Sequence, residues 1–284
     1  MDTARVAVVG GGRMGRGIAH AFLLQGFRVL LLDVTDEALH SAQLAIRESL
    51  VQSMERISGI NDDEALVRLA LSTTLTDIAD CSLVIEAVPE DFELKEHVLS
   101  RIDEAISSTA LLATNTSSFS VQDLANSRKY RNNFLGLHFF NPVPSSLMVE
   151  IVSTSHNSPE IIDIASDWVS LIGKTPLRIA DSPGFATSRL GVILGLEAMR
   201  MLEEGVATAG DIDAAMMLGY KHPIGPLKLT DIVGLDVRLG ISQYLETHFG
   251  ARFKPPKILV DLVAEGNLGR KSGKGFYEWG GEAK

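Results

Sequence analysis

Two side chains of this 284-residue sequence, His138 and Glu150, are of the types that a proton-transfer site needs. His138 lies at the end of a predicted strand, and Glu150 lies within the apolar run 148–152. Histidine can take or give a proton near pH 7, and a neighbouring carboxylate would orient the ring and stabilise its charged form. A carboxylate among apolar neighbours also needs a polar partner. Strand geometry allows this pairing without requiring it, and the alternative is a core histidine with a glutamate facing outward from an edge strand.

A second candidate site is the glycine-rich segment 10–15, which has the spacing Gly-x-Gly-x-x-Gly between a predicted strand and a predicted helix. In such a unit the first glycine makes the tight turn, the second lets the backbone approach a pyrophosphate, and the third lets helix and strand pack closely. The start of the helix offers free N–H groups and a positive dipole end to phosphates. We therefore expect these residues of the turn to bind a dinucleotide: Gly10, Gly12, Arg13, Met14 and Gly15.

Asp33 ends the next predicted strand, 18 positions after Gly15. This is near the spacing of about 20 at which an acidic residue binds the adenosine ribose. Its carboxylate can accept both ribose hydroxyls, and it would repel a 2′-phosphate. Val34 and Thr35 supply no neighbouring cation, so the sequence favours NAD over NADP, with Arg13 as the one feature that could weaken the rejection of NADP. The alternative is a structural glycine turn beside a solvated aspartate.

The composition is that of a globular protein, with 45% hydrophobic and 22% charged residues. It excludes a disordered chain, a collagen-like repeat and a disulfide scaffold. The net charge is −10, so nucleic acid is not an expected partner, and an anionic substrate needs a local basic patch. No apolar run reaches the roughly 18 residues of a membrane span, and no signal-peptide pattern opens the sequence. Cys81 is the single cysteine. From these features we expect a cytoplasmic protein that does not bind membranes.

Predicted strands and helices alternate up to the turn cluster 181–184, and the rest of the chain is predicted to be helical. Strands are expected at 5–9, 28–33, 71–73, 82–88, 110–114, 134–140, 148–152 and 175–179, with helices at 16–24, 36–70, 92–105 and 158–172. The stretch 36–70, broken at Ser58-Gly59, is too long for a minimal crossover and predicts an inserted helical hairpin. The predicted fold is α/β: a Rossmann-type doubly wound sheet with this hairpin over residues 1–183, followed by an all-helical C-terminal domain over 184–284.

The first turns of the helix expected at 189–204 are apolar on almost every side, starting from Leu190. A helix of this kind is buried against several neighbours or against a second subunit. Gly191 and Gly195 would permit close approach of another helix. We therefore expect a homodimer formed mainly through the helical domain; the alternative is burial of this surface within one subunit. Further helices are expected at 208–218, 226–233, 237–249 and 256–264.

Eight motifs occur in order along the chain: 10–19, 86–90, 115–118, 136–142, 181–185, 222–226, 234–236 and 269–277. Together they resemble those of the L-3-hydroxyacyl-CoA dehydrogenases, and most closely the bacterial 3-hydroxybutyryl-CoA dehydrogenases. The resemblance covers essentially the whole chain and is far more specific than the glycine turn alone. It implies reversible oxidation of a (3S)-3-hydroxyacyl-CoA, expected to be short-chain, to the 3-oxoacyl-CoA with NAD as acceptor.

The resemblance also implies roles for individual residues. His138 matches the family's base, Glu150 its partner, and Ser117 a residue that contacts substrate and cofactor near the nicotinamide. Four further residues match cofactor contacts: Glu90, Lys95, Asn141 and Lys271. Ser49 and Arg56, in the helical insertion, match contacts with the CoA moiety; for these two the alternative is a solvated helix face. No spacing of His, Cys, Asp or Glu predicts a metal site.

Ser188 is a departure from the family pattern. After Pro183-Gly-Phe the family has a dipeptide and then Asn-Arg, and that asparagine helps to hold the substrate; here Ser188 takes its position. A hydroxyl still donates one hydrogen bond but is shorter than an amide and lacks its second group. This departure bears on substrate choice and rate rather than on the class of reaction. A related dehydrogenase of gulonate or carnitine, and a dinucleotide-binding protein without turnover, stay open as alternatives.

Overall fold

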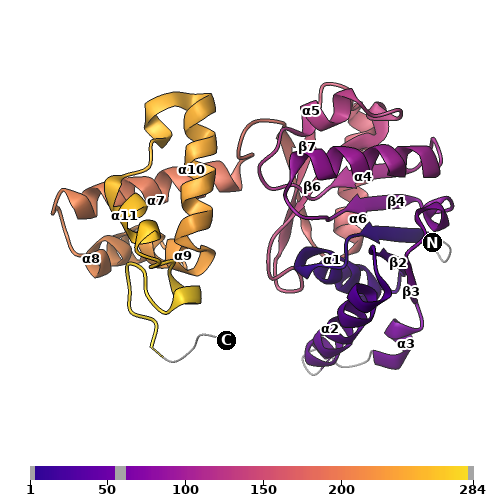
Figure 1. The fold of residues 1–284 in the computed structure, drawn as a ribbon, viewed down its shortest axis with the longest axis horizontal. Helices are drawn as coiled ribbons and strands as arrows, with labels where there is room; N and C mark the ends of the chain where they lie inside the picture. Colours follow the sequence, from indigo (N-terminus) through magenta and orange to yellow (C-terminus); the bar gives the residue numbers. More distant parts are fainter. Residues whose placement is uncertain (1–3, 55–61, 281–284) are drawn as a thin grey trace. The chain divides into compact units, whose positions relative to one another are not determined.

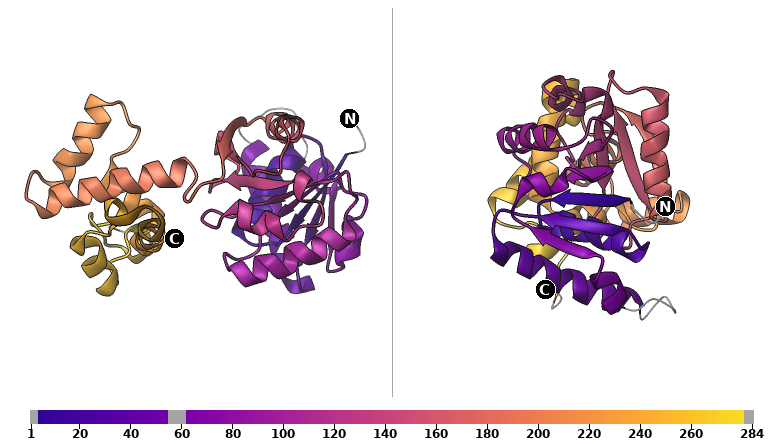
Figure 2. Two further views of the ribbon diagram at one scale, coloured as in Figure 1. Left: turned by 90° about the horizontal axis from the view of Figure 1, so that it is seen from above. Right: turned by 90° about the vertical axis from the view of Figure 1, so that its right-hand side faces the viewer.

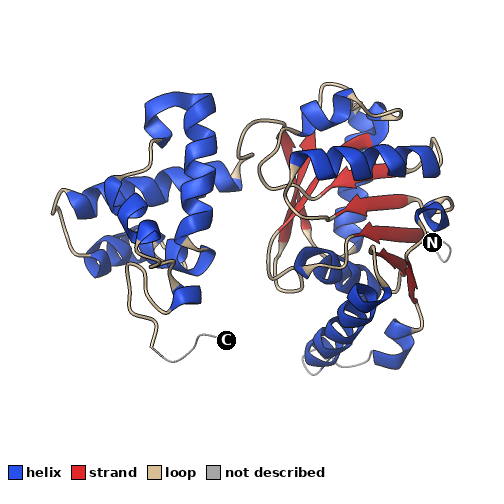
Figure 3. Cartoon of the chain, in the orientation of Figure 1, coloured by secondary structure: helices blue, strands red, loops and turns tan. Residues whose placement is uncertain are grey.

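The structure, a computed structural model, describes residues 4–54 and 62–280 and divides into two compact units, one ending at Ser182 and one starting at Pro183 (Figure 1). The first unit is a sheet with helices on both faces. The second is helical, and its only described β pairing consists of isolated bridges of Lys274 with Gly269 and Glu278 (Figure 3). This arrangement confirms the predicted fold class. None of the described helices is long and apolar enough to cross a membrane.

The sheet of the first unit has eight strands in the order β3-β2-β1-β4-β5-β6-β7-β8. The strands are β1 (Arg5–Val9), β2 (Arg28–Leu32), β3 (Leu69–Ser72), β4 (Leu83–Glu86), β5 (Leu111–Thr114), β6 (Phe134–Phe139), β7 (Met148–Ser153) and β8 (Thr175–Ala180). Every neighbouring pair is parallel except β6 and β7, which run antiparallel. The chain runs outward from β1 in both directions, so the carboxyl ends of the parallel strands meet at one edge, where ligands bind in such sheets.

Helices cover the sheet on both faces: α1 (Arg13–Leu24), α2 (Asp36–Met54), α3 (Asp62–Leu66), α4 (Phe92–Ala105), α5 (Val121–Asn126) and α6 (Pro159–Leu171). α4 and α6 lie on opposite sides of the sheet (Figure 2). Because strand side chains alternate between faces, Val6 and Val8 of β1 join one core cluster with α1, α2 and α6. Phe22 of α1 contacts Trp168 of α6 in that cluster, with ring centroids 6.2 Å apart. The site described below therefore stands on strands buried from both sides.

The inserted hairpin differs from the prediction in its second arm. α2 ends at Met54, and α3 is only five residues long. The next strand, β3, begins at Leu69, which is two positions earlier than expected. The predicted break at Ser58-Gly59 lies outside the described residues. A run of apolar residues does not by itself distinguish a helix from a strand; here 69–72 pairs with β2 as the edge of the sheet. The short helix α5 was not predicted, and its start is capped by Ser120, whose hydroxyl accepts from the Asp123 N–H at 3.1 Å.

The second unit contains α7 (Thr187–Glu203), α8 (Ala209–Ala214), α9 (Pro226–Val233), α10 (Leu235–Phe249) and α11 (Lys257–Ala264) around a core of its own. The predicted helix at 208–218 changes to π geometry at Ala215. Two buried carboxylates organise the unit. Asp213 accepts from two N–H groups at the start of α9, at Leu227 and Lys228. Asp231 accepts from backbone N–H groups in the C-terminal segment, which it holds against α9.

Candidate active site

A cavity of about 760 Å³ lies within the first unit, at the carboxyl edge of the sheet. This volume is in the range of small-molecule and cofactor sites. The glycine turn contributes Gly10, Gly12, Arg13 and Met14 to its lining. Four residues from later strands and turns line it as well: Asp33, Glu90, Ser117 and His138. The structure thus brings eight of the sequence-predicted site residues to one cavity.

The glycine turn has the shape that a pyrophosphate needs. Gly10 has φ +109°, and a side chain there would lie 2.7 Å from the carbonyl oxygen of Ala87. A Cβ at Gly15 would overlap the Gly10 carbonyl at 1.7 Å, whereas one at Gly12 would meet nothing within 4 Å. The first and third glycines are therefore required by packing, and the second leaves open space. The first turn of α1 carries no acidic residue and its N-cap makes no side-chain hydrogen bond, so its N–H groups can receive phosphate oxygens.

The carboxylate of Asp33 is fixed beside the glycine turn by two hydrogen bonds from backbone N–H groups. Its Oδ2 accepts from the Gly11 N–H at 2.6 Å, and its Oδ1 accepts from the Val34 N–H at 2.7 Å. Each oxygen of an ionised carboxylate has a further lone pair, so both can still accept a ribose hydroxyl. Val34 is exposed at the cavity wall and brings no cation. The turn and the strand end together fit the adenosine half of a dinucleotide.

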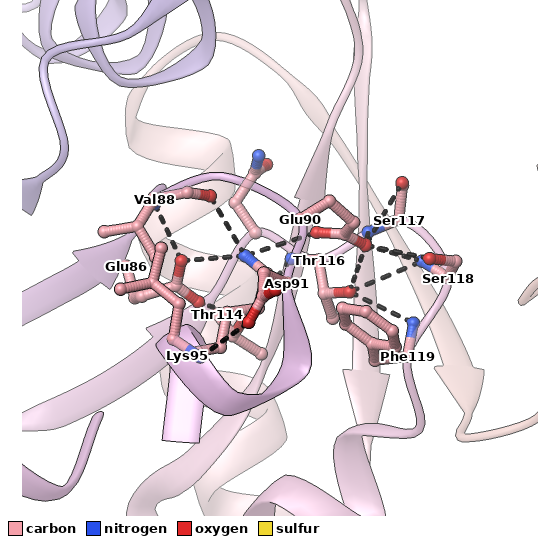
Figure 4. Close-up of polar contacts among 12 residues, drawn as sticks. Glu86, Val88, Glu90, Asp91, Lys95, Thr114, Thr116, Ser117, Ser118 and Phe119 are labelled. Atoms are coloured by element: carbon pink, nitrogen blue, oxygen red, sulfur yellow. Dashed lines mark hydrogen bonds and ion pairs between the residues drawn. The ribbon is translucent and has the colours of Figure 1, made fainter. Parts of the chain in front are cut away.

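Glu90 organises the turn that carries Ser117 (Figure 4). Its Oε1 accepts from the Thr116 hydroxyl at 2.6 Å and from the Ser117 and Ser118 N–H groups at 2.9 and 3.2 Å. The Ser117 hydroxyl points to the same oxygen at 3.4 Å. Burial raises the pKa of Glu90, but the ammonium of Lys95 and these hydrogen bonds lower it by more, so the net pKa is below its usual value. Glu90 is therefore an anion at neutral pH that orients the Ser117 turn.

Lys95 lies beneath the cavity rather than in its lining. It is fully buried, and its Nζ lies 2.8 Å from Glu86 Oε1 and 3.3 Å from both Glu90 Oε2 and the Val88 carbonyl. Glu86 is itself buried and also accepts from the Thr114 hydroxyl at 2.6 Å. Figure 4 shows the Lys95 ammonium between the carboxylates of Glu86 and Glu90. In the structure Lys95 forms an ion pair with Glu90 and so helps to fix its position. A direct contact of Lys95 with the cofactor stays a prediction.

His138 and Glu150 face each other across β6 and β7, where they are direct partners in the antiparallel register. His138 Nδ1 lies 2.8 Å from Glu150 Oε2, and both side chains are buried. An ionised carboxylate only accepts, so the proton of a neutral His138 is assigned to Nδ1, which leaves Nε2 as a lone-pair acceptor. The ring also packs against Phe140, with centroids 4.3 Å apart. His138 lines the cavity, and this pair can therefore work as a base and its orienting carboxylate.

Asn115 is a site residue that the sequence analysis did not single out. Its Oδ1 accepts from the Phe139 N–H at 2.9 Å, next to His138, and its side chain lines the same cavity. It ties the end of β5 to the end of β6. The sequence feature that could have identified Asn115 is its position at the start of the motif 115–118, directly after a buried strand.

A smaller cavity of about 180 Å³ is lined by Arg13, Arg16, Ser49 and Asn141, among others. Arg13 also lines the larger cavity. Arg16 was not predicted as a site residue, although a second arginine in the first turn of α1 was visible in the sequence. Asn141, predicted as a cofactor contact, lies in this smaller cavity. Arg56, predicted to contact CoA beside Ser49, lies outside the described residues.

The Ser49 hydroxyl lies 2.8 Å from Nδ1 of His20, a fully buried residue of α1. Burial, with a contribution from the charge of Lys174, lowers the pKa of His20 to about 4, so the ring is neutral at pH 7. Lys174 donates to the carbonyls of Val143 and Ser146 and so holds the segment after β6 in place.

Two predicted site residues belong to the second unit. Ser188 is half-buried in the first turn of α7. Lys271 is half-exposed, and its Nζ lies 2.6 Å from both carboxylate oxygens of Asp236. Burial raises the pKa of Asp236, but the Lys271 ammonium and neighbouring backbone N–H groups together lower it by more, so the net pKa is below its usual value. Among the described residues of both units, no group of three or more His, Cys, Asp or Glu side chains is placed to hold a metal ion.

The chain is similar to known proteins over nearly its whole length. Residues 5–182 match the family model described as 3-hydroxyacyl-CoA dehydrogenase, NAD binding domain, and residues 184–279 match that of the C-terminal domain. A probable 3-hydroxyacyl-CoA dehydrogenase of Caenorhabditis elegans is 38% identical over 283 residues, which cover 96% of this chain and 95% of that protein. The 3-hydroxybutyryl-CoA dehydrogenase of Clostridioides difficile is 36% identical, covering 97% and 99%. The solved structure of (S)-3-hydroxybutyryl-CoA dehydrogenase from Ralstonia eutropha is 35% identical, with a TM-score of 0.93 over 98% of this chain and 99% of that one.

Proposed function

The chain belongs to the 3-hydroxyacyl-CoA dehydrogenase family, as its motifs predicted, and we propose that it acts on short-chain (3S)-3-hydroxyacyl-CoA, foremost 3-hydroxybutyryl-CoA. It is an NAD-dependent oxidoreductase. The short acyl chain is supported by the relatives that are named 3-hydroxybutyryl-CoA dehydrogenases. The observation that carries the proposal is the His138–Glu150 pair, which shares one cavity with the glycine turn and Asp33.

In the oxidation direction His138 is the general base. Its Nε2 takes the proton of the 3-hydroxyl group, while the buried carboxylate of Glu150 holds Nδ1–H and stabilises the imidazolium that forms. Bound NAD supplies the acceptor for the hydride that leaves C3. In the reverse direction His138 returns the proton to the 3-oxo oxygen, so the same pair serves both directions.

Ser117 is proposed to contact both the substrate and the cofactor. Its backbone N–H is already committed to Glu90, which fixes the turn, but its hydroxyl makes only a long hydrogen bond of 3.4 Å to the same carboxylate. Rotation about one bond would release that hydroxyl to donate to the reacting oxygen. Glu90 keeps the backbone of the turn in place during this change because its other hydrogen bonds are independent of the Ser117 hydroxyl.

The dinucleotide is proposed to be held by the residues that the sequence indicated. The backbone at Gly10 and Gly12 and the start of α1 at Arg13 and Met14 would receive the pyrophosphate. Asp33 would bind the adenosine ribose. For Glu90, Lys95, Asn141 and Lys271, contact with the cofactor stays a proposal from the family pattern.

The smaller cavity is proposed to bind part of the CoA moiety. It supplies positive charge from Arg13 and Arg16 on a chain whose net charge is −10, and hydrogen-bonding groups from Ser49 and Asn141. Phosphate groups are bound by this combination of arginines and neutral donors. Arg56 is proposed to add to it.

A homodimer is proposed to form through the helical unit. Leu190 of α7 is 67% exposed, and Leu218 and Tyr220 are 74% and 76% exposed. Gly191 and Gly195, expected to admit a neighbouring helix, instead face Arg238 and Thr230 of the same chain. The support therefore comes from the exposed apolar side chains rather than from the glycines. Light scattering at micromolar concentration tests it, and a monomeric mass would reject it.

A cytoplasmic location is proposed as well. Cys81 is buried as a free thiol, and burial raises its pKa to about 11, which keeps it protonated and unreactive. A chain without disulfides suits a reducing compartment. Fractionation of cells expressing the protein tests this, with recovery outside the cytoplasmic fraction as the contrary result.

The test of the proposed activity is the oxidation of NADH with acetoacetyl-CoA, compared with the reduction of NAD by L-gulonate and by carnitine. We expect the CoA thioester to react with a kcat/KM far above that of the other two substrates, and free CoA to compete with it. Faster turnover of gulonate or carnitine, or none with acetoacetyl-CoA, would overturn the proposal.

A further inference from the structure

Three arginines lie next to one another where the adjacent strands β1, β2 and β3 begin, at the edge of the sheet opposite the cavity that contains His138 (Figure 1). Arg5 and Arg28 are the first residues of β1 and β2, and they are direct partners in the parallel register. Arg68 directly precedes β3, and its carbonyl accepts from the Val29 N–H at 2.9 Å. Neighbouring strands are roughly 4.8 Å apart, so three positive charges start from adjacent backbone positions.

The three arginines surround a cavity of about 270 Å³, and no acidic side chain is found in its lining among the residues that the structure describes. Its lining consists of three cationic and three apolar residues: Arg5, Arg28, Arg68, Val29, Val67 and Ala70. The glycine turn follows Val9 at the other end of β1. The two ends of this strand are roughly 13 Å apart at about 3.3 Å per residue, so this cavity is separate from the proposed dinucleotide site.

Only part of this positive charge is compensated. Arg5 forms a salt bridge with Asp80 at 2.7 Å, and its Nη1 also donates to the Asp77 carbonyl at 3.3 Å. The Nε of Arg68 is shielded from solvent and has no hydrogen-bond partner. In the described part of the chain, no carboxylate pairs with Arg28 or Arg68. Like charges side by side on neighbouring strands destabilise a sheet, and a shielded donor without an acceptor adds to that cost, so the cluster calls for an anionic ligand.

We propose that this three-arginine cavity binds the phosphate groups of a small molecule, as a second anion site that the dehydrogenase activity does not use. A phosphate group carries about two negative charges, and its oxygens match the planar fork of a guanidinium. A single carboxylate would leave more of the positive charge without compensation. The volume is close to the lower end of small-molecule pockets, which suits a diphosphate or the phosphate end of a nucleotide. The net charge of −10 disfavours a nucleic acid as the ligand.

The test is calorimetric titration of the full-length protein with pyrophosphate, in the presence of saturating NADH so that the dinucleotide site is filled. The wild-type protein is expected to bind pyrophosphate saturably at millimolar concentration, and added KCl should weaken the binding because it screens the charges. Arg28→Met and Arg68→Met should each raise the Kd by roughly tenfold or more, the scale of one hydrogen-bonded charge pair. Absence of binding to the wild-type protein would overturn the proposal.

Two further variants show whether the binding belongs to this cavity. Arg178→Met is the matched control, since Arg178 is an exposed arginine of the same unit that pairs with Asp163 and lines none of these cavities; its Kd should equal that of wild type. Arg16→Met removes a cation from the smaller cavity that is proposed for CoA. If pyrophosphate binding is lost in Arg16→Met and unchanged in Arg28→Met and Arg68→Met, the ligand binds at the smaller cavity and the proposal is wrong.

Melting temperatures separate recognition from folding. Without pyrophosphate, Arg28→Met and Arg68→Met should melt at the wild-type temperature or above it, because each removes one of several neighbouring like charges. Pyrophosphate should raise the melting temperature of the wild-type protein and not that of the variants, since a ligand that binds only the folded state stabilises it. Variants that melt below wild type without pyrophosphate would show that the chain itself already compensates these charges, which contradicts the need for a ligand.

A comparison of tripolyphosphate with ATP identifies the source of the phosphate groups. Equal Kd values would assign the cavity to phosphate groups alone, and tighter binding of ATP would assign it to a nucleotide. Arg28→Met and Arg68→Met should keep kcat and KM for acetoacetyl-CoA within about twofold of wild type when no phosphate is present, because they lie at the opposite edge of the sheet from His138. The site therefore stands or falls separately from the proposed dehydrogenase activity.

Discussion

His138 Nδ1 lies 2.8 Å from Glu150 Oε2 because β6 and β7 pair antiparallel and place these two residues directly opposite each other. In a sheet whose other neighbouring pairs are parallel, this reversal puts the carboxylate on the strand next to the histidine. Both residues are buried, and the pairing gives each of them a polar partner. The reactive ring is thus oriented by two strands rather than by a loop.

Replacement of His138 by alanine should remove most turnover and keep NADH binding. The expected loss in kcat is about 10²–10⁴, the usual contribution of a positioned acid–base group. Glu150→Gln should cost less, because it leaves the base in place but orients it poorly and no longer stabilises its charge. Stopped-flow rates and fluorescence titration with NADH measure the two effects separately. A His138→Ala enzyme with near-normal kcat would assign the base to another residue.

The enzyme should prefer NAD to NADP by at least tenfold in kcat/KM. The carboxylate of Asp33 would repel the 2′-phosphate, and it cannot turn away easily because both of its oxygens hold backbone N–H groups. Asp33→Ser should raise the KM for NADH and narrow this preference. Initial rates with NADH and NADPH at equal concentration are the measurement. A wild-type preference for NADPH would contradict the expectation and make Arg13 the first residue to test.

The buried His20 should make the protein less stable in mild acid. Its pKa is about 4 when folded against about 6.5 when unfolded, so between these values the unfolded chain binds more protons. The free energy of unfolding should therefore fall as the pH is lowered from 6.5 to 4, by about 3 kcal/mol, and this contribution is fully present above pH 6.5. Urea unfolding of wild type and His20→Gln over this range measures this contribution. The free energy of unfolding should fall less steeply with decreasing pH in His20→Gln than in wild type.

His97→Gln, which removes an exposed histidine of α4, is the control for that experiment and should retain the wild-type slope. If His20→Gln and wild type lose stability in parallel between pH 6.5 and 4, His20 is accessible to protons in the folded protein and its neutral state is not maintained.

Arg16→Ala should weaken the binding of acetoacetyl-CoA without changing kcat. Arg16 lines the smaller cavity with Arg13 and Ser49, and its loss would remove one contact with a phosphate. We expect the KM to rise by roughly tenfold or more, because one hydrogen bond to a charged group contributes about 1.5–3 kcal/mol. The KM for acetoacetyl-N-acetylcysteamine, a thioester without phosphates, should not change.

Arg178→Ala is a suitable control for Arg16→Ala because Arg178 forms an exposed salt bridge with Asp163 and lines neither cavity. An equal rise in KM for both thioesters in Arg16→Ala would show that the arginine acts on the shape of the site rather than on a phosphate.

Ser188→Ala should be damaging without abolishing activity, at a cost of roughly 0.5–1.5 kcal/mol in kcat/KM, the net scale of one neutral hydrogen bond. Ser188→Asn should be tolerated, with activity on acetoacetyl-CoA kept within about tenfold. Steady-state kinetics over short and medium acyl chains is the measurement. If Ser188→Ala has no effect on any of them, Ser188 does not contact the substrate and Thr187 becomes the next candidate.

Features that depend on neighbours in the chain could be predicted from the amino-acid order. The glycine turn follows from backbone conformations that only glycine adopts without clash, as at Gly10. The observed bounds of α4 match the predicted range 92–105, and its start is capped by Asp91, which accepts from the Leu94 N–H at 2.8 Å. Asp33 was placed by its distance along the chain from the turn. These are local properties, and short-range sterics and hydrogen bonds are sufficient to specify them.

The remaining features depend on which elements pack together. Twelve positions separate His138 from Glu150 in the sequence, and only the direction and register of β6 and β7 make them partners. The roles of Asn115 and Arg16 were missed because each arises from contact with a distant segment. The burial of Arg238 could not be found from the sequence, since an arginine is exposed in most contexts and the packing of α10 against its neighbouring helices buries this one. Burial and pairing across long separations come from the cooperative packing of the whole unit, which no local pattern encodes.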